Sequence, residues 1–347
     1  MPHDLMAGTM MQHVTLGRTG LQTSWLGLGT APIGSLFAPV TPQQAHAVVE
    51  RAWAHGIRLF DTAPLYGFGM AEQRLGTVLA GKPREAFVLT TKVGRLLRTE
   101  GVPDLSNYVD GEPIFKDAPD LRPVFDFSRA GVQASLAESR HRLGLERIDI
   151  AYLHDPDNHF EQASGTGLAA LQAERAAGAL AGLGAGMNQT AMLTRFVRET
   201  DVDVVLVAGR YSLLDRSAQD ELLPLCAQRG VAVVVGGVFN SGILAQPHGN
   251  ATYNYVTAPD AMVRRALRLQ SICADHGVPL RAAALQFARR HTAVTAVLVG
   301  ARSVQEVDDA VAMAAITIPP ALWRDLDAEY MDFTGEGATR GTPDTRE

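Results

Sequence analysis

The chain has 347 residues, of which 46% are hydrophobic and 20% are charged, and its formal net charge is −6. This balance is typical of a packed globular protein and excludes a disordered chain or a small disulfide-stapled fold. No run of lysine and arginine is longer than a pair. Nucleic acid and anionic membranes are therefore not expected as partners, because both require a concentrated basic surface.

The composition also indicates where the protein works. Its two cysteines, Cys226 and Cys273, are too few for a disulfide framework and do not form a Cys-x-x-Cys site, which fits a reducing compartment. No apolar run is long enough to span a bilayer, and the first residues lack the pattern of a signal peptide. We expect a cytoplasmic protein with a flexible N-terminal extension at 1–13, one domain at 14–333 and a flexible tail at 334–347.

Strand-like and helix-like segments alternate along the chain. A short apolar strand at 24–30 ends in Ala31-Pro32, and the helix after it has Thr41 as its N-cap and Pro42 at its first position. Further strands are expected at 57–61, 87–92, 148–154, 180–186, 202–207, 231–236 and 296–300. Further helices are expected at 70–80, 128–143 (with Ser128 as its cap), 165–179, 190–199, 216–229, 261–276 and 280–290.

These eight strands predict a parallel α/β fold. Strands buried on both faces read as continuous apolar runs, and a helix between successive strands forces parallel pairing. Eight such units over roughly 250 to 400 residues predict a (β/α)8 TIM barrel, here with an N-terminal β-hairpin. The alternative, a doubly wound open sheet, calls for G-x-G-x-x-G after its first strand. Neither GLG at 27–29 nor GLG at 182–184 continues into that motif.

Two connections are longer than ordinary loops. They span 93–127 and 237–259, and both follow the carboxyl end of a strand, so we expect them on the catalytic face. The first is rich in proline and carries four aromatic residues, of which at least one is expected to face the substrate: Tyr108, Phe115, Phe125 and Phe127.

Four chemically active side chains lie at or just after the ends of three consecutive strands. Asp61 ends the second strand with Tyr66 five residues later, Lys92 ends the third, and His154 ends the fourth. In a barrel these positions surround one mouth. The ammonium of Lys92 is expected to favour the phenolate of Tyr66 and to lower its pKa, while Asp61 offsets the cost of burying that ammonium.

Such a set performs half of an alcohol–carbonyl interconversion. Tyr66 moves a proton on and off an oxygen that His154 orients. The other half is a hydride transfer, which no amino acid supplies, so a nicotinamide cofactor is implied. Singly, each residue has a structural explanation such as a cap or a solvated charge. No metal is expected at His154, Asp155 and Asp157, because no second histidine stands at helical spacing.

Several phrases of the sequence resemble the aldo-keto reductases. They are LGRTGL (16–21), FDTAPLYG (60–67), TKVG (91–94), LH (153–154) and GARS (300–303). The resemblance implies that Tyr66 is the general acid/base, with Asp61, Lys92 and His154 as partners, and that NAD or NADP is the cofactor. It places Asn188 at the nicotinamide carboxamide. The other implied cofactor contacts are Phe239, Asn240, Ser241, Gly242 and Leu244 along the pyrophosphate, and Gly300, Ala301, Arg302, Ser303, Glu306 and Asp309 at the adenosine end.

The phrases YLHDPD (152–157) and GRYSLLD (209–215), with the long 93–127 connection, resemble the D-threo-aldose 1-dehydrogenase and L-fucose dehydrogenase branch more narrowly. The implied reaction is oxidation of a sugar such as L-fucose or D-arabinose at C1 to a lactone. The alternatives are a pyridoxal 4-dehydrogenase, a general aldehyde or carbonyl reductase, and a nucleotide-sensing module without catalysis. The sequence leaves the oligomeric state and the physiological direction open.

The chain also departs from the family pattern. Ala208, Gly236 and Ala310 stand where a glutamine, a nicotinamide-stacking tyrosine and an adenine-binding asparagine are common. Glu306 stands where many members have an arginine for the 2′-phosphate of NADP. Because a carboxylate repels a phosphate, NAD is the expected cofactor, although Arg302 and Arg264 offer charge nearby.

Overall fold

The computed structural model describes residues 11–101, 107–109 and 111–335, with only the backbone described for 332–335. Most of the expected N-terminal extension and of the expected tail lies outside the described residues. His13, the last residue of the expected extension, begins the strand His13–Thr15, and the last helix, α11 (Pro320–Gly335), includes the first two residues of the expected tail.

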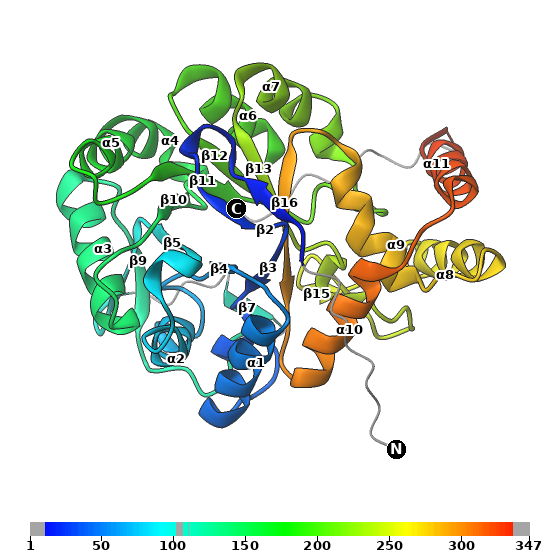
Figure 1. Cartoon of the computed structure of the whole chain (residues 1–347), viewed down its shortest axis with the longest axis horizontal. Helices are drawn as coiled ribbons and strands as arrows, with labels where there is room; N and C mark the ends of the chain where they lie inside the picture. Colours follow the sequence, from blue (N-terminus) through cyan, green and yellow to red (C-terminus); the bar gives the residue numbers. More distant parts are fainter. Residues whose placement is uncertain (1–10, 102–106, 110, 336–347) are drawn as a thin grey trace.

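Eight parallel strands close into a barrel, which confirms the predicted fold (Figure 1). Each strand lies within two residues of its predicted position. In chain order they are β3 Leu26–Gly29, β4 Leu59–Asp61, β5 Val88–Val93, β10 Ile150–His154, β11 Gly182–Met187, β12 Val204–Ala208, β13 Ala232–Gly236 and β16 Val294–Gly300. Every strand pairs with its neighbour in the chain, and β16 closes the barrel on β3 with Val297 opposite Leu26.

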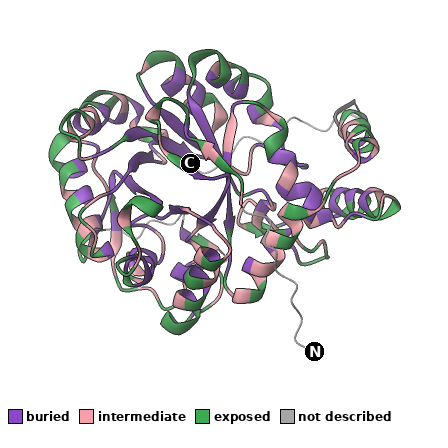
Figure 2. Ribbon diagram, in the orientation of Figure 1, coloured by how far each residue is buried: buried purple, intermediate pink, exposed green. Residues whose placement is uncertain are grey.

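Most of the helices surround the barrel, with buried residues facing the strands and exposed residues on the outside, while the helices Asp260–Asp275 and Pro320–Gly335 lie farther out, on the right of the view (Figure 2). The helices are α1 Pro42–Ala54, α2 Met70–Leu79, α3 Arg129–Leu143, α4 Phe160–Gln162, α5 Leu168–Ala176, α6 Thr190–Glu199, α7 Leu222–Arg229, α8 Asp260–Asp275, α9 Leu280–Phe287, α10 Val304–Ala315 and α11. Thr41 caps α1 through a full capping box with Gln44, and Ser128 caps α3, as expected. None of the helices in the described residues is long and apolar enough to cross a membrane.

Two helices differ from expectation at their starts. The segment predicted at 165–179 begins as a π-helical turn, Ala163–Gly167, that runs into α5. The segment predicted at 216–229 begins with a 3₁₀ turn at Ser217–Gln219, and α7 starts only at Leu222. Pro224 lacks an N–H and therefore fits only the first turn of a helix, which explains the late start of α7.

The barrel interior is filled by apolar side chains and closed at its amino end. Its core contains Leu59, Val88, Ile150, Tyr152, Val204, Leu206, Ala232, Val234, Ala296 and Leu298. The predicted hairpin, β1 (His13–Thr15) with β2 (Gln22–Ser24), crosses this end in Figure 1 and adds the fully buried Leu16 to the same core. A ligand therefore has to approach from the carboxyl ends of the strands.

The two long connections are only partly irregular. In the first, β6 (Arg95–Arg98) pairs antiparallel with β9 (Arg122–Phe125), and β7 (Tyr108–Val109) with β8 (Glu112–Pro113). The second contains a 3₁₀ turn, η8 (Asn240–Gly242), and the hairpin of β14 (Thr252–Tyr253) with β15 (Val256–Thr257). Both follow the carboxyl ends of barrel strands, as predicted.

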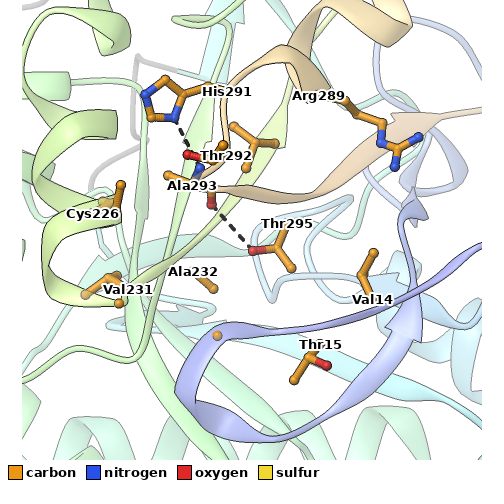
Figure 3. Close-up of a pocket in the computed structure, with 14 residues that line it drawn as sticks. Val14, Thr15, Cys226, Val231, Ala232, Arg289, His291, Thr292, Ala293 and Thr295 are labelled. Carbon is orange, nitrogen blue, oxygen red and sulfur yellow. Dashed lines mark hydrogen bonds between the residues drawn. The ribbon is translucent and has the colours of Figure 1, made fainter.

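A hollow of about 420 Å³ lies at the opposite end, beside the first residues of β13 and β16 (Figure 3). Val14 of the hairpin, Cys226, Arg289 and His291 are among the residues that line it. None of the predicted site residues does, so the chemistry expected from the sequence belongs to the other end of the barrel.

Candidate active site

Two buried side chains form an ion pair where β4 and β5 end. Lys92 Nζ donates to Asp61 Oδ2 at 2.7 Å, and Thr90 Oγ1 donates to Asp61 Oδ1 at 2.7 Å. Lys92 is 2% exposed and Asp61 is 3% exposed. Burial by itself lowers the pKa of Lys92, but the nearby Asp61 and Tyr66 outweigh it and raise this pKa above its usual value. Lys92 therefore stays an ammonium at neutral pH.

Tyr66 lies on the loop after β4, against this ammonium. Lys92 Nζ is 4.6 Å from the centroid of the Tyr66 ring. Close backbone contact fixes the loop, because a Cβ on Gly34 would come within 2.8 Å of the Tyr66 carbonyl carbon and one on Gly67 within 2.3 Å of the Gly34 carbonyl oxygen. Gly67 also has a φ of 61°, which favours glycine. The position of Tyr66 thus depends on two glycines.

The pKa of Tyr66 differs from the sequence-based expectation. Burial raises it, the ammonium of Lys92 lowers it by charge and hydrogen bonding, and the carboxylate of Asp61 raises it, which together bring the pKa to about 12. Lys92 acts in the predicted direction, but desolvation of the phenolate is the larger effect. The expected net lowering is therefore wrong for the free protein, in which Tyr66 is a phenol at neutral pH.

His154, the last residue of β10, meets Tyr66 edge-on. The two ring centroids are 6.0 Å apart and the ring planes are at 90°. Burial, with Arg95 and Lys92 nearby, holds the pKa of His154 well below 6.5, so the imidazole is neutral. Its Nδ1 is buried and has no hydrogen-bond partner among the described residues. A neutral imidazole has one N–H and can hold a carbonyl oxygen without taking the proton that Tyr66 transfers.

These residues open onto a cavity of about 150 Å³ at the carboxyl end of the barrel. Tyr66, Lys92 and His154 line it together with Asn188, another residue predicted for the site. Asn188 follows β11, and its Nδ2 donates to the Ala208 carbonyl at 3.1 Å. Apolar parts of the lining come from Leu36, Leu65, Ile114, Phe115, Met187 and Leu206. The cavity thus joins a proton-transfer group to a partly apolar chamber suited to a small molecule.

Residues 25–330 match the Aldo/keto reductase family. The chain belongs to this family. It is 44% identical to D-threo-aldose 1-dehydrogenase of Pseudomonas sp, over 88% of this chain and 94% of that protein. It is 43% identical to pyridoxal 4-dehydrogenase of Microbacterium luteolum, over 90% of this chain and 96% of that protein. Aldo-keto reductase AKR11C1 from Bacillus halodurans shares the fold, with a TM-score of 0.71, 24% identity and coverage of 97% and 100% of the two chains.

Aldo-keto reductases are oxidoreductases that use NAD(P)H, and most of the residues that the sequence predicts for this nucleotide lie on two loops of the barrel. The loop after β13 holds the predicted residues Phe239, Asn240, Ser241, Gly242 and Leu244, and that after β16 holds Gly300, Ala301, Arg302 and Ser303. The two strands pair, so the loops are neighbours. In the first loop Leu244 is fully buried, which leaves mainly its backbone for a ligand, and Asn240 Oδ1 is a buried acceptor without a partner among the described residues. An unpaired buried acceptor calls for a hydrogen-bond donor, and the ribose hydroxyls of a nicotinamide nucleotide are such donors, whereas its pyrophosphate oxygens are not.

The predicted adenosine end carries charges that are already paired. Arg302 Nη2 donates to Glu306 Oε1 at 2.8 Å, and the Arg302 backbone N–H donates to Glu306 Oε2 at 2.8 Å. Ser303 caps α10 by accepting from the Glu306 N–H. Asp309 forms a bidentate ion pair with Arg281, with both distances 2.8 Å. Glu306 therefore neutralises the arginine closest to it in sequence.

The structure also adds residues that the sequence did not assign to substrate or cofactor. Arg95, Asn107 and Tyr255 line the cavity, and so does Asp155, considered before only as a metal ligand. Arg95 and Asp155 closely follow Lys92 and His154 in the sequence. This position near the strand ends was a signal that could have assigned both residues to the site. Of the aromatic residues in the first connection, only Phe115 lines the cavity. No cluster of three or more metal-binding side chains occurs within the described ranges.

Proposed function

We propose that this aldo-keto reductase oxidises an aldose at C1 to the lactone, with NAD as the hydride acceptor and with L-fucose or a D-threo sugar such as D-arabinose as substrate. The observation that carries the proposal is Tyr66 held between the Lys92 ammonium and the neutral His154 at a cavity with a polar side. The similarity to D-threo-aldose 1-dehydrogenase supports the choice of substrate.

In this proposal each residue has one task. Tyr66 takes the proton from the C1 hydroxyl, and His154 holds the same oxygen by a hydrogen bond. Lys92 stabilises the phenolate that this role requires, while Asp61 neutralises and positions Lys92. The nicotinamide, when bound, accepts the hydride from C1, and Asn188 is the residue we assign to its carboxamide.

Preference for NAD over NADP is part of the proposal. The 2′-phosphate of NADP needs a free cation, and Arg302 is paired with the Glu306 carboxylate. Replacing that pair by a phosphate–arginine pair would leave Glu306 against a second negative charge. A cytoplasmic location also belongs to the proposal, since Cys226 and Cys273 are both unpaired thiols in the structure.

Pyridoxal is the second candidate substrate. Its cyclic hemiacetal offers a similar hydroxyl beside a flat ring, and Phe115 tilts over Tyr66 at a centroid distance of 6.4 Å, where it could cover such a ring. The similarity to pyridoxal 4-dehydrogenase also favours this candidate.

A comparison of kcat/KM tests the proposal. The purified protein is assayed with L-fucose, D-arabinose and pyridoxal, each with NAD and with NADP, and the product is identified. We expect the highest kcat/KM for one of the sugars with NAD, and an aldonolactone as product. A clear preference for pyridoxal, or activity only as an aldehyde reductase, would overturn the aldose assignment.

A further inference from the structure

An ion pair with no task in the proton transfer lies in the same cavity. Arg95 Nη2 donates to Asp155 Oδ2 at 2.9 Å, and this oxygen is 3.5 Å from His154 Nε2. Both Arg95 and Asp155 line the cavity with Tyr66. The pair thus lies next to His154, the residue that we assign to the C1 oxygen of the substrate. The carbons beyond C1 have to fit into this part of the cavity.

The fold holds Arg95 rigidly. It is the first residue of β6, its side chain is 8% exposed, and its guanidinium lies 4.7 Å from the centroid of the Phe125 ring on the paired strand β9. The chain reaches this position through Gly94, whose φ is 97° and where an added Cβ would fall within 2.0 Å of the Phe127 ring. Because this guanidinium is buried and held in one place, it also fixes the position of the carboxylate that it binds.

Asp155 is aimed into the cavity by its backbone. Its φ of 41° lies in the left-handed region, and its N–H donates to the Gly186 carbonyl at 3.0 Å. In contrast to Arg95, its side chain is 26% exposed. A carboxylate offers about four acceptor positions. The exposed part of Asp155 is therefore able to accept further hydrogen bonds from a molecule in the cavity.

Asp155 Oδ2 and His154 Nε2 are 3.5 Å apart, so the hydroxyl oxygens on two adjacent sugar carbons can each face one of these atoms. We propose that Asp155 accepts a hydrogen bond from the hydroxyl on the carbon next to the oxidised carbon, and that Arg95 is a positioning residue for it. This inference rests on the proposed aldose oxidation and deepens it. The hydrogen bond to Asp155 selects sugars with a correctly oriented C2 hydroxyl. A substrate that lacks this hydroxyl leaves the partly buried carboxylate without the hydrogen bond that the hydroxyl would donate. Pyridoxal has no hydroxyl on the carbon next to its reacting carbon.

Three pentoses test the pair. D-ribose has the C2 hydroxyl of D-arabinose inverted, and 2-deoxy-D-ribose lacks it, while the other carbons are unchanged. For the unmodified protein we expect kcat/KM with D-arabinose to exceed both others at least tenfold. Asp155→Ala should lower kcat/KM for D-arabinose and bring the three sugars within about threefold of one another. Arg95→Met should reduce the same selectivity mainly through KM.

Selectivity is a ratio within one protein preparation, so a loss of folded enzyme does not change it. Asp157→Asn is the matched control, since this acid lies two residues away and does not line the cavity, and it should keep the original selectivity. NADH binding, followed by fluorescence, should be unchanged in the Asp155 variant. If the unmodified protein does not oxidise any aldose, the proposed function fails. If it does, and Asp155→Ala keeps the selectivity for the C2 hydroxyl, only the role of Asp155 is refuted.

Discussion

Lys92 and Asp61 form a hydrogen-bonded ion pair of 2.7 Å in which both side chains are almost fully buried. Two charges taken out of water are costly, and their attraction offsets this cost only while both are present. The pair also contributes to the electrostatics of the site, because the Lys92 ammonium lies beside the ring of Tyr66.

Lys92→Met should therefore destabilise the fold as well as slow the reaction. The substitution leaves the Asp61 carboxylate buried without its cation, a change that costs about 3–5 kcal/mol in comparable buried pairs. The double variant Asp61→Asn/Lys92→Met should regain much of this free energy of unfolding but none of the activity. Urea unfolding and kcat measure the two effects. A double variant whose stability loss is the sum of the two single losses would show that the pair is not coupled.

Tyr66→Phe should remove most turnover and leave nucleotide binding intact. General acid/base groups contribute about 10²- to 10⁴-fold to the rate, and phenylalanine keeps the ring while it loses the hydroxyl. Steady-state kcat and NADH fluorescence are the measurements. A decrease in kcat of less than about threefold would be incompatible with the role of Tyr66.

The rate of oxidation should rise with pH. The pKa of Tyr66 is raised to about 12 in the free protein, so the phenolate fraction increases about tenfold per pH unit below that value. We expect kcat/KM for aldose oxidation to increase from pH 7 to pH 10, whereas kcat/KM for aldehyde reduction, which uses the phenol, should not. His154 should add no break near pH 6.5, since its pKa is well below this value. A flat oxidation profile between pH 7 and 9 would contradict the assignment.

Glu306→Gln should shift the cofactor preference toward NADP. The substitution removes the carboxylate that pairs with Arg302 and so frees a cation for a 2′-phosphate. Because both side chains are well exposed to solvent, we expect the NADP/NAD ratio of kcat/KM to rise by a moderate factor, about tenfold. Glu161→Gln, a change at an exposed acid on α4, is the control for net charge. An unchanged ratio would mean that Glu306 does not set the preference.

Much of the fold follows from local sequence. The caps at Thr41 and Ser128 depend on a side chain and a backbone N–H three residues apart, so they are readable from the chain. The pairing of β6 with β9 cannot be predicted in this way, because a proline-rich stretch separates the two strands and no hairpin turn lies next to either of them. The π-helical turn at Ala163–Gly167 likewise has no pattern that we recognise.

The site likewise has features that the sequence predicts and features that it does not. Asp61, Lys92 and His154 could be assigned because the parallel barrel brings the ends of consecutive strands together. The contact between Arg95 and Asp155 could not, since it depends on how two different loops pack through Gly94. The pKa of Tyr66 was misjudged because the sequence identifies the neighbouring charge of Lys92 but does not reveal that desolvation of the phenolate opposes this charge and outweighs it.

Transfer of a labelled hydride tests the central claim most directly. The protein is incubated with NAD and with L-fucose or D-arabinose that carries deuterium at C1, and the products are analysed by mass spectrometry. We predict one deuterium on the reduced nicotinamide, an aldonolactone without deuterium at C1, and at least a hundredfold slower reaction for Tyr66→Phe. Unlabelled NADH, or a lactone formed equally fast by Tyr66→Phe, would contradict aldose oxidation at this site.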